Sequence, residues 1–264
     1  MIISAYLAIA LYGSALLWQA LRLRAGQREV TPHIGLSALR IAAVLAHGIS
    51  ASQSLMTPEG YVFGLMQVNS LIFFAIMAVL VFSQMVRPMG VMLVLLFPLA
   101  ILSVILSLVI PPQEAAKTHY DAGLASHILT SILAYALLTI AAVQAMLVSV
   151  QHERLRDHRL QGLLQVIPPL QSMEHILFQF IGLGFLLLST SIVTGFLFFD
   201  DLFAQHLMHK TVLSMLAWVV FAVLLAGHLW WGWRGPTASR WTLWGFGLLL
   251  LAYAGSQFVL EFLL

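Results

Sequence analysis

Long apolar stretches separated by short polar connections run through the whole sequence. Eight windows are apolar enough, and long enough at about 1.5 Å per helical residue, to cross a ~30 Å hydrocarbon core. They span residues 2–21, 34–55, 68–85, 90–110, 123–150, 177–199, 211–229 and 243–264. Prolines stand in several connections, at Pro58, Pro88, Pro111 and Pro236, where helices are expected to end. The pattern predicts an all-α polytopic membrane bundle of eight transmembrane helices.

The seventh window and its flanks combine an apolar span with polar ends. His209 and Lys210 precede it, His228 lies just inside its far end, and three tryptophans and Arg234 follow. Tryptophan and arginine are typical of the point where a helix meets the lipid headgroups. We therefore expect an interfacial belt at this end, and the histidines are the first candidates for chemistry.

Composition excludes a soluble domain and several kinds of site. Hydrophobic residues make up 61% of the chain and charged residues only 8%, too few to cover a water-exposed surface. The chain has no cysteine, which excludes thiol redox chemistry, iron–sulfur clusters, disulfides and covalent haem attachment through a Cys-x-x-Cys-His site. No repeat or linker divides the sequence, so we expect a single domain, residues 1–264, embedded in a membrane.

Arginine and lysine are unevenly distributed between the two sets of connections. The connections after windows one, three, five and seven carry nine arginines, namely Arg22, Arg24, Arg28, Arg87, Arg154, Arg156, Arg159, Arg234 and Arg240. The opposite side carries only Lys117 and Lys210. Because cationic loops tend to stay in the cytoplasm, the first set should lie inside and both termini outside.

The longest inner connection, residues 151–176, mixes charged residues with leucines and contains Pro168 and Pro169. We interpret it as a cytoplasmic extension of the fifth helix followed by a short segment lying along the membrane surface. A docking site for a cytoplasmic partner is the alternative.

Ten histidines are unusual in so apolar a chain. Counted at about 1.5 Å per residue, His47 lies roughly 12 Å below the outer end of its window and His127 about 6 Å below the same surface. These two could share one ligand in the outer half of the bilayer, whereas His228 lies near the inner face. His206 and His209, three residues apart, could hold a divalent metal if their loop is helical, although solvated helix caps explain them as well.

Polar residues at helical spacing accompany these histidines. His127, Ser131 and Tyr135 fall at i, i+4 and i+8 and share a helix face. Arg40 stands seven residues before His47 and shares its face. Ionisable groups inside a span are costly and usually face the bundle, which makes them functional candidates. The alternative for each histidine is a structural hydrogen bond to a neighbouring helix. Arg40 is expected to snorkel to the inner surface, or else to pair with an acidic ligand group such as a haem propionate.

Three motifs in the second half of the chain resemble one known family. SHILTSILAYALL opens a helix with a histidine before an aromatic residue, LAWVVFAVLLAGHLWWGWRG ends on Gly-Trp-Arg-Gly, and LAYAGSQFVLEFLL carries Tyr-x-Gly. Their order and spacing resemble the cytochrome c assembly family of haem-handling membrane proteins, which includes CcsA, CcmC and HemX-like proteins. The likeness extends more loosely to the first four helices, including LAHGIS around His47. The chain most resembles the short, eight-span bacterial subgroup called YpjD-like.

This resemblance implies non-covalent b-type haem (haem b) held by histidines of the helices, with a role in haem handling or cytochrome biogenesis. His127 matches the family's outer haem histidine, and His228 matches the histidine late in the following long helix. His47 and His127 are the expected iron ligands, because two imidazoles from facing helices suit a low-spin haem. Arg40 and Tyr135 complete the candidate cofactor-binding residues.

Two departures from the family pattern concern what becomes of the haem. The family's haem exporters carry Trp-Gly-x-x-Trp-x-Trp-Asp on the outer loop before the seventh span, whereas the loop here is DDLFAQHLMHK, without tryptophan. The family's second outer histidine, expected after the last-helix motif, has no counterpart before Leu264. We therefore expect haem to be retained or sensed rather than presented to apocytochrome c.

Two other functions compete with haem binding. One is a haem-free accessory or regulatory subunit of another membrane protein or transporter, with the histidines joining helices. The other is a membrane enzyme or transporter that uses histidines as proton relays or metal ligands. Our interpretation is that the protein is not an enzyme, that its partners are membrane lipid and at most another inner-membrane protein, and that it binds no nucleic acid.

The arginine asymmetry predicts an outward C-terminus. A reporter that is active only in the cytoplasm, fused after Leu264, should be silent, and the same reporter inserted after Arg156 should be active. Activity at both positions would mean an even number of spans between them instead of the predicted three.

Overall fold

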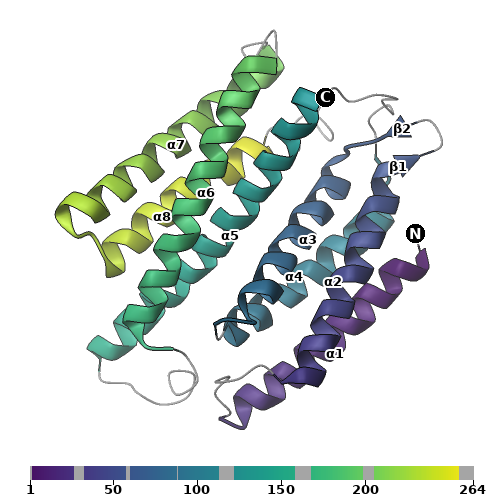
Figure 1. Ribbon diagram of the computed structural model, residues 1–264, viewed down its shortest axis with the longest axis horizontal. Coiled ribbons are helices and arrows are strands. Elements are labelled where there is room, and N and C mark those ends of the chain that lie inside the picture. Colours follow the sequence, from purple (N-terminus) through teal and green to yellow (C-terminus); the bar gives the residue numbers. More distant parts are fainter. Residues whose placement is uncertain are drawn as a thin grey trace. The chain divides into compact units, whose positions relative to one another are not determined.

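The computed structural model describes residues 2–26, 33–57, 60–87, 89–112, 122–157, 168–198 and 205–255. Within these ranges the chain is almost entirely helical, which confirms the all-α prediction (Figure 1). The helices are α1 (Ile2–Arg24), α2 (Ile34–Leu55), α3 (Leu65–Ser83), α4 (Gly90–Val109), α5 (Ala122–Arg156), α6 (Leu170–Phe198), α7 (Gln205–Trp231) and α8 (Gly235–Leu250). A short antiparallel hairpin, β1 (Met56–Thr57) with β2 (Gly60–Tyr61), joins α2 to α3.

Seven of the described helices, α1 to α7, are long and apolar enough to cross a membrane. The start of the eighth differs from the prediction: α8 begins at Gly235 instead of residue 243. The reason is Pro236, which we expected to end a helix but which lies in the first turn of α8, where a missing N–H costs nothing. After Leu250 the chain continues as a π-helix, η2 (Leu251–Gly255). Residues 256–264 lie outside the described residues, so eight spans and two outer termini stay predictions.

The inner connection between α5 and α6 is shorter than expected. Helix α5 runs for 35 residues to Arg156, which confirms the predicted extension of the fifth helix. Helix α6 begins at Leu170, directly after Pro168 and Pro169, and so includes residues that we had assigned to the connection. The segment expected to lie along the membrane surface falls on residues 158–167, outside the described residues.

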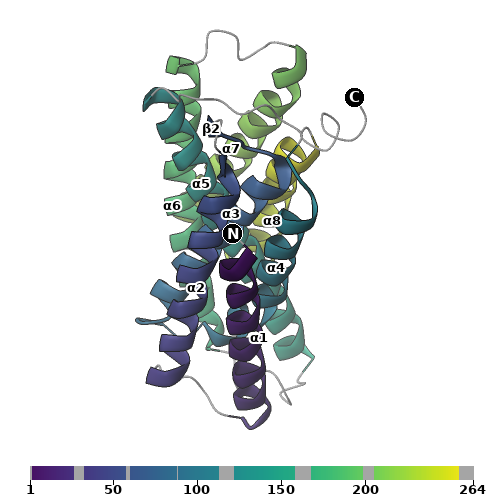
Figure 2. The same cartoon turned by 90° about the vertical axis from the view of Figure 1, so that its right-hand side faces the viewer.

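The helices form two compact units, which are described separately. Unit 1 contains α1 to α4, and unit 2 contains α5 to α8 with η2. In unit 1, α1 packs against α2 and α4, and α3 packs against the same two helices (Figure 2). In unit 2, α5 packs against α6 and α8, and α7 also packs against both. The single domain over residues 1–264 stays a prediction.

Small residues let the helices of unit 1 approach closely. The buried stripe of α1 consists of Ala5, Ala8, Tyr12, Ala15 and Gln19, at spacings of three and four. Since lipid offers apolar side chains as good a solvent as the bundle does, such close contacts and interhelical hydrogen bonds are what favour association in a membrane. Tyr12 and Gln19, the two polar members of the stripe, can form such interhelical hydrogen bonds.

The α5–α6 contact in unit 2 depends on a glycine. A Cβ added to Gly184 of α6 would lie 2.8 Å from Cγ of Leu138 and 3.4 Å from Cβ of Leu137, both on α5. All three residues are buried. Gly182, two residues earlier on the same helix, has nothing within 4 Å of the corresponding position.

We predict that Gly184→Val destabilises the protein by about 1–3 kcal/mol, because the added side chain overpacks the contact with Leu138. Gly182→Val is the matched control, since it makes the same chemical change on the same helix in open space. Thermal unfolding of the purified protein in detergent measures the difference. Equal melting temperatures for the two variants would show that this contact tolerates a side chain.

Candidate functional site

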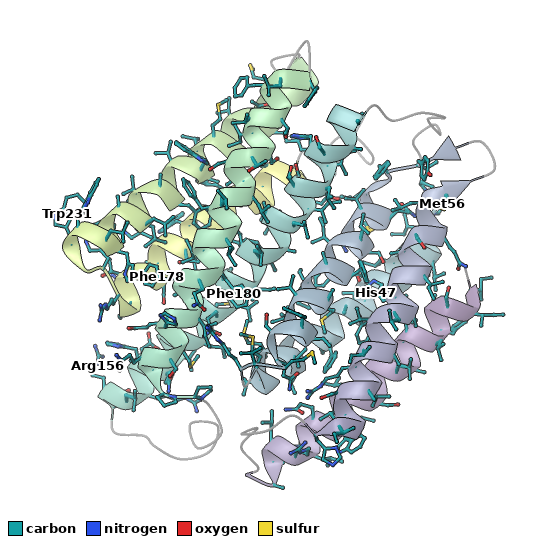
Figure 3. All side chains as sticks on the ribbon, viewed as in Figure 1. His47, Met56, Arg156, Phe178, Phe180 and Trp231 are labelled. Atoms are coloured by element: carbon teal, nitrogen blue, oxygen red, sulfur yellow. The ribbon has the colours of Figure 1, made fainter. Side chains whose placement is uncertain are left out.

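The first candidate, His47 on α2, is fully buried in unit 1 (Figure 3). Its Nδ1 lies 3.2 Å from the Tyr12 hydroxyl of α1, and its Nε2 lies 3.1 Å from the Ser70 hydroxyl of α3. The rings of Tyr12 and Phe74 meet the imidazole edge-on, with centroid distances of 5.7 and 6.0 Å. His47 therefore joins three helices of this unit.

Both ring nitrogens of His47 are engaged by hydroxyl groups. A neutral imidazole has one donor and one acceptor nitrogen, and a hydroxyl group can complement either of them. Iron binds a histidine through a nitrogen lone pair, so ligation by His47 would require Tyr12 or Ser70 to give up its contact. The geometry favours the structural alternative for His47, and its role as an iron ligand stays a prediction.

Arg40, one heptad before His47 on α2, is 1% exposed. Its Nη2 donates a hydrogen bond of 2.5 Å to Oε1 of Gln19 on α1, which is also fully buried. The expectation that Arg40 snorkels to the inner surface is therefore wrong. A guanidinium group inside a bundle is tolerated when polar atoms surround it, and Gln19 supplies one of these atoms.

Two buried polar contacts thus connect α1 to α2, in addition to the exposed hydrogen bond from Ser4 to Gln53. Tyr12 and Gln19 are seven residues apart on α1, as are Arg40 and His47 on α2. Seven residues are about two helical turns, so the contacts lie roughly 10 Å apart along the helix axes. The sequence analysis missed Tyr12 and Gln19, although their positions in a stripe of alanines would have revealed them.

The second candidate, His127 on α5, lies half-buried in unit 2 against α6. Its Nδ1 donates a 2.8 Å hydrogen bond to the backbone carbonyl of Ser191. The hydroxyl of Ser131, one turn further along α5, lies 2.6 Å from the Ser191 hydroxyl and also bonds the His127 carbonyl at 2.7 Å. The Thr194 hydroxyl lies 3.4 Å from Nδ1. Hydroxyl groups of two helices thus surround this imidazole.

The contact with Ser191 determines which nitrogen of His127 carries the proton. A carbonyl oxygen can only accept, so Nδ1 carries the hydrogen, and in the neutral ring Nε2 carries the lone pair. Nε2 lies 3.5 Å from the Ser131 hydroxyl, a long contact. Histidines that bind metals usually donate their second nitrogen to a carbonyl or carboxylate in this way, which orients the ring. His127 therefore fits the role of an iron ligand.

The stripe of His127, Ser131 and Tyr135 does not face a single neighbour. The first two side chains contact α6, whereas the Tyr135 ring packs against Phe246 of α8 and Tyr253 of η2, at centroid distances of 5.8 and 5.6 Å. Tyr135 is nevertheless part of the same unit and lies two turns from His127 along α5. Its role in a site with His127 stays a prediction.

The third candidate, His228, lies near the C-terminal end of α7. Its Nδ1 donates a 2.9 Å hydrogen bond to the Trp233 carbonyl, so the same tautomer is favoured here. Its ring stacks on Phe178 of α6, with a centroid distance of 3.5 Å and an interplanar angle of 16°. The Trp233 ring folds back over Gly227, where a Cβ would lie 2.3 Å away. His228 therefore helps to build the turn between α7 and α8.

The tryptophans at the same end form the aromatic cluster expected of an interfacial belt. Trp233 stacks on Trp231 and on Trp241, with centroid distances of 6.0 and 5.4 Å. The side chains of Trp230, Trp231 and Trp244 are 76%, 67% and 74% exposed, as those of residues that face lipid are. This exposure fits contact with headgroups.

The candidate residues are divided between the two units. His47 and Arg40 belong to unit 1, and His127, Tyr135 and His228 belong to unit 2. His127 and His228 lie at opposite ends of unit 2, which agrees with their predicted depths. The pairing of His47 with His127 on one iron stays a prediction. In the part of the chain that the structure describes, no three histidine, aspartate or glutamate side chains gather as a metal site.

The predicted pair of His206 and His209 lies partly outside the residues that the structure describes. Helix α7 begins at Gln205, so both residues are helical as the prediction requires. The side chain of His206 lies outside the described residues, and its pairing with His209 therefore stays a prediction.

Comparison with known proteins places these features in a family. The chain is similar to the inner membrane protein YpjD of Escherichia coli (strain K12), with 29% identity over 221 residues, which are 83% of this chain and 84% of the relative. It is also similar to an uncharacterized 28.8 kDa protein of Azospirillum brasilense, with 35% identity over 140 residues, or 52% of each chain. No solved structure matches the chain.

The family model described as cytochrome C assembly protein matches residues 34–264. The match begins with α2 and includes His47, His127 and His228. Since it covers most of the chain, it confirms the resemblance seen in the motifs around His127 and His228. The chain belongs to the cytochrome c assembly protein family.

Proposed function

We propose that this protein is a multi-pass inner-membrane protein that holds b-type haem through histidines of its helices, with His127 as the principal iron ligand. The observation that carries the proposal is the hydrogen bond from His127 Nδ1 to the Ser191 carbonyl, which orients the ring and leaves the lone pair on Nε2. The family supports a role in haem handling or cytochrome biogenesis. The name of the Escherichia coli relative supports the inner membrane.

The side chains around His127 suit a bound haem. Helix α5 is apolar over its span, and the Ser131 and Thr194 hydroxyls make only long contacts, of 3.5 Å to Nε2 and 3.4 Å to Nδ1. Bound haem would supply a redox-active iron whose spin state depends on the second axial ligand. The sequence predicts His47 for that ligand, whereas in the structure both of its ring nitrogens contact hydroxyl groups. His228 has a suitable tautomer and is the further candidate.

The membrane topology is part of the proposal. We infer eight spans, with α8, η2 and the residues after it forming the last one. Seven spans are supported by the length and hydropathy of α1 to α7. The nine arginines on one set of connections support an inner position for the ends of α1, α3, α5 and α7. Both termini then lie outside.

We further propose that the haem is retained rather than presented to apocytochrome c. Presentation needs an outer surface that shields the apolar faces of haem while leaving one edge accessible. The connection between α6 and α7 carries no tryptophan in the sequence, whereas the exposed Trp230, Trp231 and Trp244 lie on α7 and α8 toward the inner end of unit 2. A structural, redox or sensing role agrees with this distribution.

The hydrogen bonds of His47 favour one rival. A haem-free accessory or regulatory subunit would use its buried histidines only to join helices, as His47 does with Tyr12 and Ser70. The two functions differ in whether the purified protein carries a low-spin haem spectrum.

We predict that His127→Ala abolishes the sharp α and β bands and shifts the Soret band, because iron loses an axial imidazole. His175→Ala is the matched control: His175 is exposed on α6, where it contacts Gln179, and its loss should leave the spectrum unchanged. Absorption spectra of the purified proteins measure both. A parental spectrum for His127→Ala would show that the ligands lie elsewhere.

The same spectra distinguish the two roles of His47 when Ser70→Ala is added as a control. Ser70→Ala removes a hydrogen-bond partner but keeps the imidazole. If His47 binds iron, only His47→Ala converts the spectrum to high spin or weakens haem retention. If His47 is structural, both variants lower the melting temperature and both keep the low-spin bands.

Retention of haem predicts that deleting the gene leaves covalently attached c-type haem unchanged. Haem-stained gels of membrane and periplasmic fractions measure the c-type bands in the deletion strain and its parent. Loss of these bands, restored by the parental chain but not by His127→Ala, would instead make the protein an assembly factor that delivers haem.

A further inference from the structure

Ser191 on α6 contacts the helix of the proposed iron ligand twice. Its backbone carbonyl accepts the 2.8 Å hydrogen bond from His127 Nδ1, and its hydroxyl lies 2.6 Å from the Ser131 hydroxyl of α5. Ser191 is only 5% exposed, so water has little access to these contacts. Two polar groups of one residue thus hold α6 against a single turn of α5.

The hydrogens in these contacts can be assigned because each hydroxyl group carries only one. The Ser131 hydroxyl lies 2.7 Å from the backbone carbonyl of His127, which can only accept, so Ser131 donates its hydrogen there. Ser131 has no second hydrogen and therefore accepts at the 2.6 Å contact, where the Ser191 hydroxyl is the donor.

The three hydrogen bonds form a closed ring. The Ser191 hydroxyl donates to Ser131, Ser131 donates to the carbonyl of His127, and the imidazole of His127 donates Nδ1–H to the carbonyl of Ser191. The ring includes both polar parts of His127, its backbone and its imidazole. Hydrogen bonds in such a network support one another, so the loss of one hydroxyl group should loosen the contact at Nδ1.

Ser131 acts on the imidazole through Ser191 and not by a short contact of its own. Its hydroxyl oxygen lies 3.5 Å from Nε2 of His127, a long distance for a hydrogen bond, and its hydrogen is directed to the carbonyl. A metal at Nε2 would therefore leave the ring of hydrogen bonds intact. This differs from His47, whose two ring nitrogens lie 3.2 and 3.1 Å from hydroxyl groups.

We propose that Ser131 is a positioning residue for His127: through Ser191 it holds in place the carbonyl that receives the Nδ1 proton. The inference rests on the proposed haem-binding function, because the oriented imidazole is the proposed iron ligand. A fixed hydrogen bond from Nδ1 to a carbonyl keeps the lone pair on Nε2 and makes the imidazole a stronger donor to a metal. Ser131 would thereby lower the reduction potential of bound haem without contacting it.

The first measurement is the tautomer of His127 in the full-length protein purified without haem. Nitrogen NMR of protein with isotope-labelled histidine distinguishes an N–H nitrogen from one with a lone pair, and the signals missing from His127→Gln are those of His127. The parental ring should carry its proton on Nδ1 alone. In Ser131→Ala a second tautomer, with the proton on Nε2, should appear. Ser191→Ala should have the same effect, because it removes the same contact and keeps the backbone carbonyl.

Two variants serve as controls. Ser126→Ala makes the same change on the same helix, where the hydroxyl bonds the Gly123 carbonyl of α5 itself at 2.7 Å, and should keep the parental tautomer. Ser131→Thr keeps a hydroxyl group and should keep that tautomer as well. The double variant of Ser131→Ala with Ser191→Ala should change the tautomer no more than either single variant, because both break one bond.

The second measurement is the midpoint potential of the haem-loaded protein. Ser131→Ala and Ser191→Ala should shift it to more positive values, because a weaker hydrogen bond at Nδ1 makes His127 a weaker donor to iron. Ser126→Ala should leave it unchanged.

The parental tautomer in both Ser131→Ala and Ser191→Ala would overturn the inference, and a lower melting temperature alongside it would show that the two serines only join helices. A second tautomer with an unchanged midpoint potential would overturn the effect on iron. The proposed function fails by a separate result, a parental haem spectrum in His127→Ala. The tautomer is measured without haem, so that failure leaves the positioning of the imidazole testable.

Discussion

Polar side chains inside apolar helices have no water to bind, and this requirement organises both units of the protein. An unsatisfied polar group in hydrocarbon costs about 2–7 kcal/mol. Each buried donor or acceptor therefore needs a partner, and a neighbouring helix can supply it. In unit 1 the partners are hydroxyl, amide and imidazole side chains at the contacts of α2 with α1 and α3. In unit 2 they are mostly hydroxyls and backbone carbonyls between α5 and α6.

The kind of partner decides what a histidine can do. His47 meets a hydroxyl group at each ring nitrogen, an arrangement that joins three helices and engages both lone-pair and N–H positions. His127 and His228 each donate Nδ1–H to a backbone carbonyl, which fixes the tautomer with the lone pair on Nε2. A residue of the first kind joins helices, and a residue of the second kind has the tautomer that metal-binding histidines usually show.

The polar contacts also contribute to the association of the helices within each unit. Polar contacts of unit 1, such as Arg40 with Gln19, contribute interhelical attraction that apolar side chains cannot supply in lipid. In unit 2, His127 and the hydroxyl groups around it lie toward the N-terminal end of α5, where α5 meets α6. Five of its tryptophans lie at the C-terminal end of α7, in the turn after it and in α8, namely Trp230, Trp231, Trp233, Trp241 and Trp244. The two ends of unit 2 therefore have different chemistry.

The sequence by itself determined the class of protein, the positions of seven long apolar helices and the family. Bilayer thickness imposes the length and hydropathy of a span, and both are local properties that can be counted along the chain. Local patterns also identified His47, His127 and Arg40 as polar residues inside spans, because a polar residue within an apolar stretch can be recognised from the adjacent sequence. The start of α8 was wrong because a proline that ends one helix also begins the next.

Only the tertiary structure decided which atoms those residues bind. His47 finds its partners 35 and 23 residues away, and His127 finds its carbonyl 64 residues away. Arg40 is buried rather than snorkelling because a glutamine on α1 meets it. The sequence does not show which helix faces which, nor the rotamer of each ring, and the tautomer of an imidazole follows from both. The chemistry of each histidine is therefore a property of helix packing.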